Sequence, residues 1–258
     1  MGFRFAGSRP ATLGAALVFA LAANAAMAQA AAKSTDAPAK AVTAAAPVAA
    51  APAAAADQAA LKPGNAATGQ AKAAACGACH GMDGNSTDPQ YPKLAGQNEQ
   101  YIVRQLENFK SGKRQNPIML GMATPLSKQD MRDIGAYFAS QTVLPGVADQ
   151  AVVEHGQQLF REGDVKRGIP ACMACHSIDG RGNPGAAFPQ LESQHAQYVE
   201  SVLKAWHDGD TWGTDVHSQI MPAIARQLNT DDIIAVASYI QGLHPATPAN
   251  LPQPPATP

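Results

Sequence analysis

The sequence predicts an all-α protein built from two similar domains, and three observations support this fold class. Residues 91–101 recur as 188–198 with Pro, Leu, Gln and Tyr at matching positions, and residues 119–126 recur as 221–228. After each copy of the first repeated segment, apolar residues recur at the spacing of a helix. No run of alternating polar and apolar residues is long enough for a useful strand. The chain is therefore expected to be a duplicated helical unit.

The helices are predicted in chain order from composition, apolar stripes and caps. Residues 65–75 are rich in alanine and lead directly into a cysteine motif. The next helix is indicated by a single apolar stripe, which consists of Tyr101, Ile102, Leu106 and Phe109. Ser127 followed by Asp130 predicts a capped helix, and Asn229 followed by Asp232 repeats this signal in the second unit.

The repeat also divides the chain into domains. We expect domain one at residues 64–145 and domain two at residues 146–245. Each has so small a side-chain core that a large apolar cofactor would add substantially to its stability. The Pro-rich residues 246–258 are expected to form a disordered tail.

The N-terminal residues predict export. Two arginines precede an apolar segment at 11–23, and a small-x-small cleavage signal follows at 26–28, so residues 1–28 are expected to be a signal peptide. Residues 29–63 consist largely of Ala and Pro without an aromatic residue, and we expect them to be a disordered leader. Cleavage would release the protein into the periplasm of a Gram-negative bacterium, whereas a retained signal segment would tether it to the membrane.

The motif Cys-x-x-Cys-His occurs at 76–80 and again at 172–176, and the two copies use every cysteine of the chain. Each copy is typical of covalent haem attachment, because two thiols at this spacing can form thioethers to the haem vinyl groups and the next residue can bind the iron. We therefore predict two covalently attached haem c groups. The predicted attachment residues are Cys76, Cys79, Cys172 and Cys175, and the predicted proximal iron ligands are His80 and His176.

Other uses of a Cys-x-x-Cys pair fit less well. A redox dithiol usually accompanies a βαβ pattern, which the sequence lacks. A four-cysteine zinc site would need the two pairs closer than the 92 residues that separate Cys79 from Cys172. Neither reading explains the histidine that follows both pairs.

The second iron ligand of domain one is predicted by elimination. His80 is the only histidine between residues 64 and 145, so methionine is the natural distal ligand. Met82 is too close to His80 to reach the opposite side of the haem, and Met131 falls in a predicted helix, where core packing explains it. Met119 and Met122 remain, in a stretch between two prolines that we expect to form an irregular distal loop.

The repeat decides between these two methionines. Met119 aligns with Met221, whereas Met122 aligns with Ile224. We therefore predict Met119 and Met221 as distal ligands, with His207 and His217 as the serious rivals in domain two. His195, opposite Asn98 in the repeat, is expected to be a surface residue. Ligation by His and Met fills both axial positions, which favours outer-sphere electron transfer over chemistry at the iron.

Charge is distributed unevenly between the domains. Residues 64–145 contain 8 basic and 6 acidic residues, a net charge of +2, whereas residues 146–245 contain 6 basic and 12 acidic residues, a net charge of −6. This asymmetry could orient the protein toward different redox partners at its two ends. No basic cluster indicates binding to nucleic acid.

The chain resembles the dihaem cytochrome c4 family, which has two tandem class I cytochrome c domains. The resemblance covers residues 64–245 and excludes the Ala/Pro leader. It rests on Cys-Gly-Ala-Cys-His-Gly-x-Asp-Gly-Asn from Cys76, Tyr-Pro-Lys-Leu-Ala-Gly-Gln from Tyr91, Met-x-x-Met-x-x-Pro-Leu-Ser from Met119 and Ser-Tyr-Ile-Gln-Gly-Leu-His from Ser238. The axial methionines of the family fall on Met119 and Met221.

The resemblance implies a periplasmic electron carrier rather than an enzyme. Its expected donor is a quinol-oxidising cytochrome complex, its expected acceptor is a terminal oxidase, and we expect a monomer whose membrane association is at most loose or tethered. Two alternatives stay open. One is a dihaem enzyme, such as a peroxidase or an enzyme of sulfur-compound oxidation, with an atypical haem ligated by His207 or His217. The other is a haem subunit of a periplasmic dehydrogenase.

Overall fold

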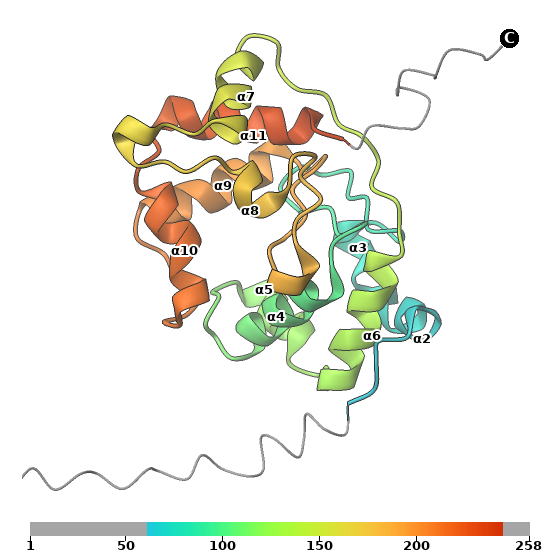
Figure 1. Ribbon diagram of the computed structural model, residues 1–258. Helices are drawn as coiled ribbons and strands as arrows, with labels where there is room; N and C mark the ends of the chain where they lie inside the picture. The colour runs from blue at the N-terminus through green and yellow to red at the C-terminus, as the bar shows by residue number, and fades with distance from the viewer. Residues whose placement is uncertain (1–60, 245–258) are drawn as a thin grey trace, which may run out of the picture. The chain divides into compact units, whose positions relative to one another are not determined.

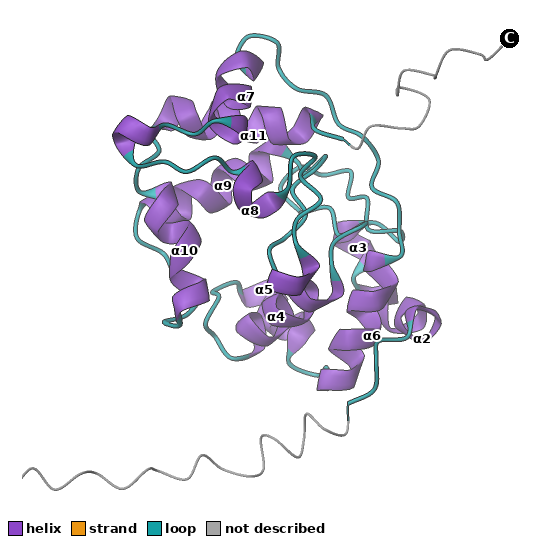
Figure 2. Cartoon of the chain, in the orientation of Figure 1, coloured by secondary structure: helices purple, strands orange, loops and turns teal. Residues whose placement is uncertain are grey.

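The computed structural model describes residues 61–244, and within them the secondary structure consists of helices (Figures 1 and 2). Strand-type pairing in this range is limited to two isolated bridges, Asp164 with Ile169 and Asn183 with Phe188. The all-α prediction is confirmed. The predicted signal peptide, nearly all of the leader and the C-terminal tail lie outside the described residues.

Domain one is organised around its last helix. α6 (Lys128–Ala139) packs against α2 (Ala66–Lys72) and α4 (Glu99–Lys110), and α4 also contacts α5 (Pro117–Ala123). Two short helices, η1 (Ala73–Ala75) and α3 (Gly77–His80), follow α2 almost directly in the sequence. The buried apolar residues of this domain are Ala73, Ile102, Leu106, Phe109, Ala123, Met131, Ile134, Tyr137 and Phe138.

Domain two repeats this arrangement. α11 (Thr230–Gly242) packs against α7 (Val153–Arg161) and α9 (Ala196–His207), and α9 contacts α10 (Val216–Ala225). Three short helices lie between α7 and α9: η2 (Val165–Arg167), α8 (Met173–His176) and η3 (Pro184–Ala186). The second core includes Phe160, Ile169, Val199, Leu203, Val236, Tyr239 and Ile240.

A glycine permits the same helix crossing in each domain. A Cβ atom added to Gly69 of α2 would lie 1.9 Å from the carbonyl oxygen of Asp133 in α6. A Cβ atom added to Gly156 of α7 would lie 2.1 Å from the carbonyl oxygen of Ala235 in α11. Real Cβ atoms do not approach oxygen so closely, so only glycine lets these helices pack with their backbones almost in contact.

The predicted capping boxes are confirmed, but the predicted distal loop is wrong. Ser127 with Asp130 and Asn229 with Asp232 form both reciprocal bonds of a capping box at α6 and α11. The stretch after Pro117 is the helix α5, because Asn116 accepts a hydrogen bond from the amide of Met119 and proline is favourable at the first helical position. A proline there marks a helix start rather than an irregular segment.

The two copies of the repeated segment meet between the domains. Gln97 and Gln194 occupy the same position in the repeat, and each side chain bonds the backbone of the opposite domain. His195 is half-buried in this contact, with its Nε2 atom 2.8 Å from the carbonyl oxygen of Ser86 in domain one. The expectation that His195 lies on the surface is therefore wrong, because sequence spacing could not show that a second domain covers it.

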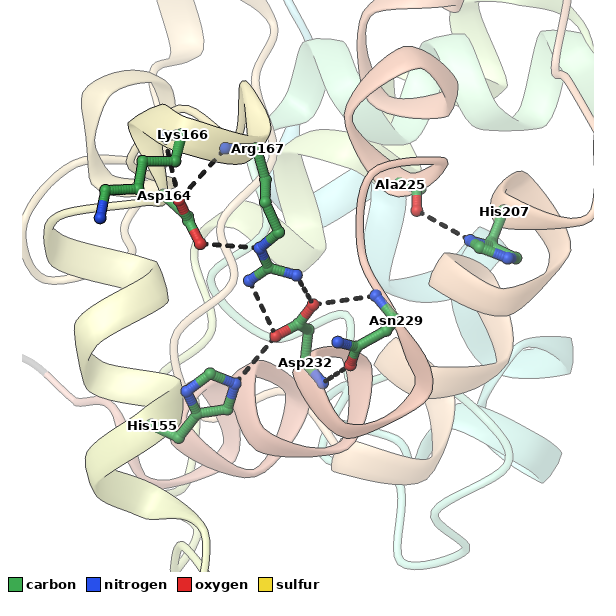
Figure 3. Close-up of polar contacts among 8 residues, drawn as sticks. All are labelled: His155, Asp164, Lys166, Arg167, His207, Ala225, Asn229 and Asp232. Atoms are coloured by element: carbon green, nitrogen blue, oxygen red, sulfur yellow. Dashed lines mark hydrogen bonds and ion pairs between the residues drawn. The ribbon is translucent and has the colours of Figure 1, made fainter.

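Asp232 is the centre of a polar cluster in domain two (Figure 3). Its side chain is only 1% exposed, and its oxygens lie 2.8 Å from His155 Nε2 and 2.5 Å from Arg167 Nη1. Burial by itself would raise the pKa of Asp232, but hydrogen bonds from Arg167, the Asn229 amide and His155 together lower it below its ordinary value. The charged carboxylate therefore ties α7 and the turn at η2 to the start of α11.

Replacing Asp232 with Asn should reduce the free energy of unfolding at pH 7 by about 2 kcal/mol, because Arg167 and His155 would lose charge-assisted hydrogen bonds to it and Arg167 would keep only Asp164 as a carboxylate partner. The folded-state pKa of Asp232 is lowered, so its stabilisation is complete above the unfolded pKa of about 3.9 and is lost as the pH falls through the folded value. Denaturant unfolding of wild type and variant at pH 7 and at pH 3 should show a smaller difference at pH 3.

Asp231→Asn is the matched control, since it removes the same charge from an exposed position in the same helical turn. This variant should reduce the free energy of unfolding by less than about 1 kcal/mol, because it loses only the interaction of the charge with the helix dipole. Equal losses in the two variants, or an Asp232→Asn loss that is independent of pH, would contradict the assigned role of the cluster.

Candidate cofactor site

Each Cys-x-x-Cys-His motif forms one tight helical turn. In domain one the amide of His80 donates to the carbonyl of Cys76 at 3.0 Å, and in domain two the amide of His176 donates to the carbonyl of Cys172 at 3.0 Å. A turn of this kind places the first cysteine and the histidine one helical repeat apart, on the same side of the segment. All four cysteines and both histidines line one cavity.

The two histidines are buried and oriented in the same way. His80 Nδ1 lies 2.8 Å from the carbonyl oxygen of Pro92, and His176 Nδ1 lies 2.9 Å from that of Pro189. A carbonyl oxygen only accepts hydrogen bonds, so Nδ1 carries the proton in each ring and Nε2 keeps its lone pair. Burial lowers the pKa of both imidazoles, which favours the neutral form that binds a metal.

The cavity that these residues line has a volume of about 560 Å³ and extends from one motif to the other. Its apolar lining comes from equivalent positions of the two repeats. In domain one these are Leu94, Ile102, Leu106, Ile134 and Phe138, and in domain two Leu191, Val199, Leu203, Val236 and Ile240. An apolar cavity with few polar groups is the environment that a large, flat, mostly apolar cofactor requires.

The polar groups around the cavity also fit a haem. Trp206 lines the cavity, and its Nε1 atom is buried without a hydrogen-bond partner among residues 61–244. An acceptor on the cofactor, such as a propionate, would satisfy this donor. Arg114 of domain one lies at the same cavity, 3.6 Å from the ring centroid of Trp212 and 2.9 Å from the hydroxyl of Tyr198.

The alternative uses of the cysteines do not fit this environment. A reactive dithiol needs a lowered thiol pKa, but burial raises the pKa of Cys172 to about 11 and also raises that of Cys76. Across the described range, no group of three or more His, Cys, Asp or Glu side chains is arranged to hold a metal ion. The four cysteines therefore do not converge as zinc ligands would.

The structure places the predicted distal methionines at the same cavity. Met119 in α5 and Met221 in α10 are both half-buried, line the cavity and pack against the core of their own domain. Met122 and Ile224 line it as well. The repeat therefore brings one thioether to the cavity from each domain, and a second from domain one alone.

The rival histidines of domain two have other partners. His207 does not line the cavity, and its Nδ1 atom lies 3.2 Å from the carbonyl oxygen of Ala225 (Figure 3). His217 does line the cavity, but its Nε2 atom lies 2.9 Å from the carbonyl oxygen of Ala186 and its Nδ1 atom lies 2.7 Å from Arg104. Both ring nitrogens of His217 are thus engaged, which removes support for an atypically ligated haem.

The structure adds residues that sequence reasoning missed. Pro92 and Pro189 supply the carbonyls that hold the proximal histidines, and Gln97 and Gln194 join the domains beside them. The repeat already contained all four as shared positions, but sequence alone could not show what their atoms contact. Trp206 could not be found from the repeat, because its counterpart Phe109 has no polar atom.

Comparison with known proteins agrees with this geometry. The family model described as Cytochrome c matches residues 66–142 and again residues 153–244. Cytochrome c4 of Pseudomonas aeruginosa is 52% identical over 181 residues, which span 70% of this chain and 90% of that protein. The chain belongs to the cytochrome c4 family. As a member it is a dihaem electron carrier rather than an enzyme, and each domain holds one covalently attached haem c.

Solved structures and more distant relatives extend this comparison. The crystal structure of reduced recombinant cytochrome c4 from Pseudomonas stutzeri superposes with a TM-score of 0.67 at 46% identity, covering 70% of this chain and all of that one. A protein of Thiomonas intermedia named thiosulfate dehydrogenase electron acceptor is 36% identical, covering 73% of this chain and 88% of that protein. Between residues 61 and 244, no helix is long and apolar enough to cross a membrane.

Replacing Cys172 and Cys175 together with Ser should lower the haem content from two per chain to one, because domain one keeps its own motif. The pyridine haemochrome assay and the mass of the intact protein measure this. Met173→Ala, a change between the two cysteines, should retain two haems. A double Ser variant with two covalent haems, or a Met173→Ala variant with one, would contradict the assignment of these attachment residues.

Proposed function

We propose that the protein is a periplasmic shuttle that takes single electrons from a quinol-oxidising cytochrome complex and passes them to a terminal oxidase. Cys76, Cys79, Cys172 and Cys175 attach the two haems. His80 with Met119 ligates one iron, and His176 with Met221 ligates the other. A bound haem supplies a reversible one-electron couple, and the chain fixes its ligands and excludes water from it.

The observation that carries this proposal is that each domain brings one histidine and one methionine, the two ligands an electron-transfer haem needs, to the same cavity. Each domain brings a buried imidazole with a free Nε2 atom and a half-buried methionine to this cavity. A haem iron held by both residues would have no open position for oxygen or peroxide, which favours transfer of electrons to and from other proteins. The shared cavity supports exchange between the two haems.

The uneven charge supports two different partners. Domain one has a net charge of +2 and domain two, to residue 245, a net charge of −6, before any haem propionate is counted. Complementary patches on redox partners would bind the two ends differently and raise the association rate at low ionic strength. Export through the predicted signal peptide would bring the protein to these partners.

A thiosulfate dehydrogenase is the second candidate donor. It is favoured by the 36% identity to the thiosulfate dehydrogenase electron acceptor of Thiomonas intermedia. A solved thiosulfate dehydrogenase of Marichromatium purpuratum also superposes with a TM-score of 0.62 at 28% identity, covering 73% of this chain and 44% of that one.

Met119→Ala should remove the distal ligand of haem one alone, and Met221→Ala that of haem two alone. The weak far-red absorption band of Met bound to ferric haem should fall from two equivalents in the wild type to one in each variant, with two haems retained. Met122→Ala, which also lines the cavity, is the control and should keep both equivalents. Two equivalents in either ligand variant would remove that ligand assignment.

The partner assignment is tested by mixing the oxidised full-length protein with a reduced quinol-oxidising complex, or with thiosulfate and thiosulfate dehydrogenase. Rapid reduction by the complex, slowed several-fold between low and physiological ionic strength, is expected because partner attraction is screened by salt. Stopped-flow absorbance at the haem bands measures the rate. Reduction only by thiosulfate dehydrogenase would replace the proposed donor with the second candidate.

A further inference from the structure

The contacts of Gln97 and Gln194 are reciprocal to the level of individual atoms. The amide of Lys93 donates to Gln194 Oε1 at 2.8 Å, and Gln194 Nε2 donates to the carbonyl of Lys93 at 2.9 Å. In the other direction, the amide of Gln190 donates to Gln97 Oε1 at 2.9 Å, and Gln97 Nε2 donates to the carbonyl of Gln190 at 3.0 Å. Each glutamine therefore holds one residue of the opposite domain by both of its backbone groups.

The backbone groups fix the orientation of each side-chain amide. A backbone amide only donates and a carbonyl only accepts, so Oε1 must face the former and Nε2 the latter. Both glutamines are buried, as are His80 and His176. Glutamine is suited to this position because it offers one acceptor and one donor at the spacing of the two backbone groups of a single residue.

The bonded peptide units are those that hold the proximal histidines. The carbonyl of Pro92 and the amide of Lys93 belong to one peptide bond, whose oxygen accepts from His80 Nδ1 and whose N–H donates to Gln194. The peptide bond between Pro189 and Gln190 likewise accepts from His176 Nδ1 and donates to Gln97. A continuous chain of two hydrogen bonds thus joins each proximal histidine to a glutamine of the other domain.

We propose that Gln194 tunes the reduction potential of haem one and Gln97 that of haem two, each through the peptide unit that holds the opposite domain's proximal histidine. These glutamines are positioning residues, because they act on the haem through the histidine. This inference rests on the proposed function only in taking His80 and His176 as iron ligands.

The physical basis is cooperative polarisation of a peptide bond. A hydrogen bond to its N–H group places more negative charge on its carbonyl oxygen, which then accepts more strongly from the imidazole Nδ1–H. A stronger bond at Nδ1 makes Nε2 a better electron donor to the iron and stabilises the ferric state. The glutamine therefore lowers the reduction potential of the haem in the domain to which it does not belong.

The test is the potential of each haem in Gln194→Met and Gln97→Met, substitutions that retain side-chain length and remove both hydrogen bonds. The potential of haem one should rise in the first variant and that of haem two in the second. In the reduced protein, the Nδ1–H proton resonance of His80, or respectively of His176, should move upfield as its bond weakens. Redox titration followed by NMR, with haem methyl signals assigned to each domain, gives the two reduction potentials and the positions of the two Nδ1–H resonances.

His195→Leu is the matched control for loosening of the interface. The side chain of His195 also crosses between the domains, with its Nε2 atom 2.8 Å from the carbonyl oxygen of Ser86, but it bonds neither histidine-bound peptide. It should leave the difference between the two potentials unchanged. Gln194→Glu keeps an acceptor for the Lys93 amide and should lower the potential of haem one more than that of haem two, which provides a second variant if Gln194→Met fails to fold.

The crossed pattern is the decisive result. Equal shifts at both haems, a shift confined to the variant's own domain, no shift, or the same shift in His195→Leu would each overturn the inference. The far-red band and haem count of the wild type, measured on the same samples, report separately on the proposed ligation. Two haems and two Met bands in the wild type, with no crossed shift in the variants, would refute this inference alone. Missing Met bands would refute the ligation, and the potentials of the variants would still show whether each glutamine acts on the haem of the opposite domain.

Discussion

The hydrogen bond from each proximal imidazole to a proline carbonyl is the constraint on which the rest of the structure depends. It holds a buried ring at the cavity in one orientation and one tautomer, in which Nε2 keeps its lone pair. A ring free to rotate would not present a lone pair to a fixed iron. Three parts of each domain surround this bond and shield it from water. They are the turn of the Cys-x-x-Cys-His motif, the loop that carries the proline, and the apolar helices.

Duplication of this unit accounts for much of the molecule, and the departures from symmetry are informative. The cores, the glycine crossings and the capping boxes occur in both domains. Each domain also has a carboxylate cluster between its first and last long helices, Lys72 with Asp130 and Asp133 in domain one and His155 and Arg167 with Asp232 in domain two. Within residues 61–244, the unpartnered Trp206 indole and the strongly negative charge belong to domain two. The shared features stabilise a haem domain, whereas the unshared ones are where the two haems of a cytochrome c4 could acquire different properties.

The family membership limits the chemistry to electron transfer, and the side chains show how that limit is enforced. The rival histidines of domain two have other hydrogen-bond partners, His217 with Arg104 and Ala186, and His207 with Ala225. These partners belong in part to domain one, so the interface itself keeps competing ligands away from the second haem. The contact between the domains is therefore part of each site.

The sequence by itself determined the fold class, the two haems and the repeat, because covalent attachment, helix capping and helical periodicity depend on residues close together in the chain. Local signals also misled, since Asn116 and Pro117 begin a helix where a loop was expected. Only the tertiary structure decided which carbonyls hold the histidines, that His195 is half-buried, and that Gln97 and Gln194 cross between domains. The histidine–carbonyl contacts span 12 and 13 positions across a loop whose course no helical pattern predicts. The contacts between the domains join residues 93 to 109 positions apart, and no pattern within one repeat can reveal how it packs against the other.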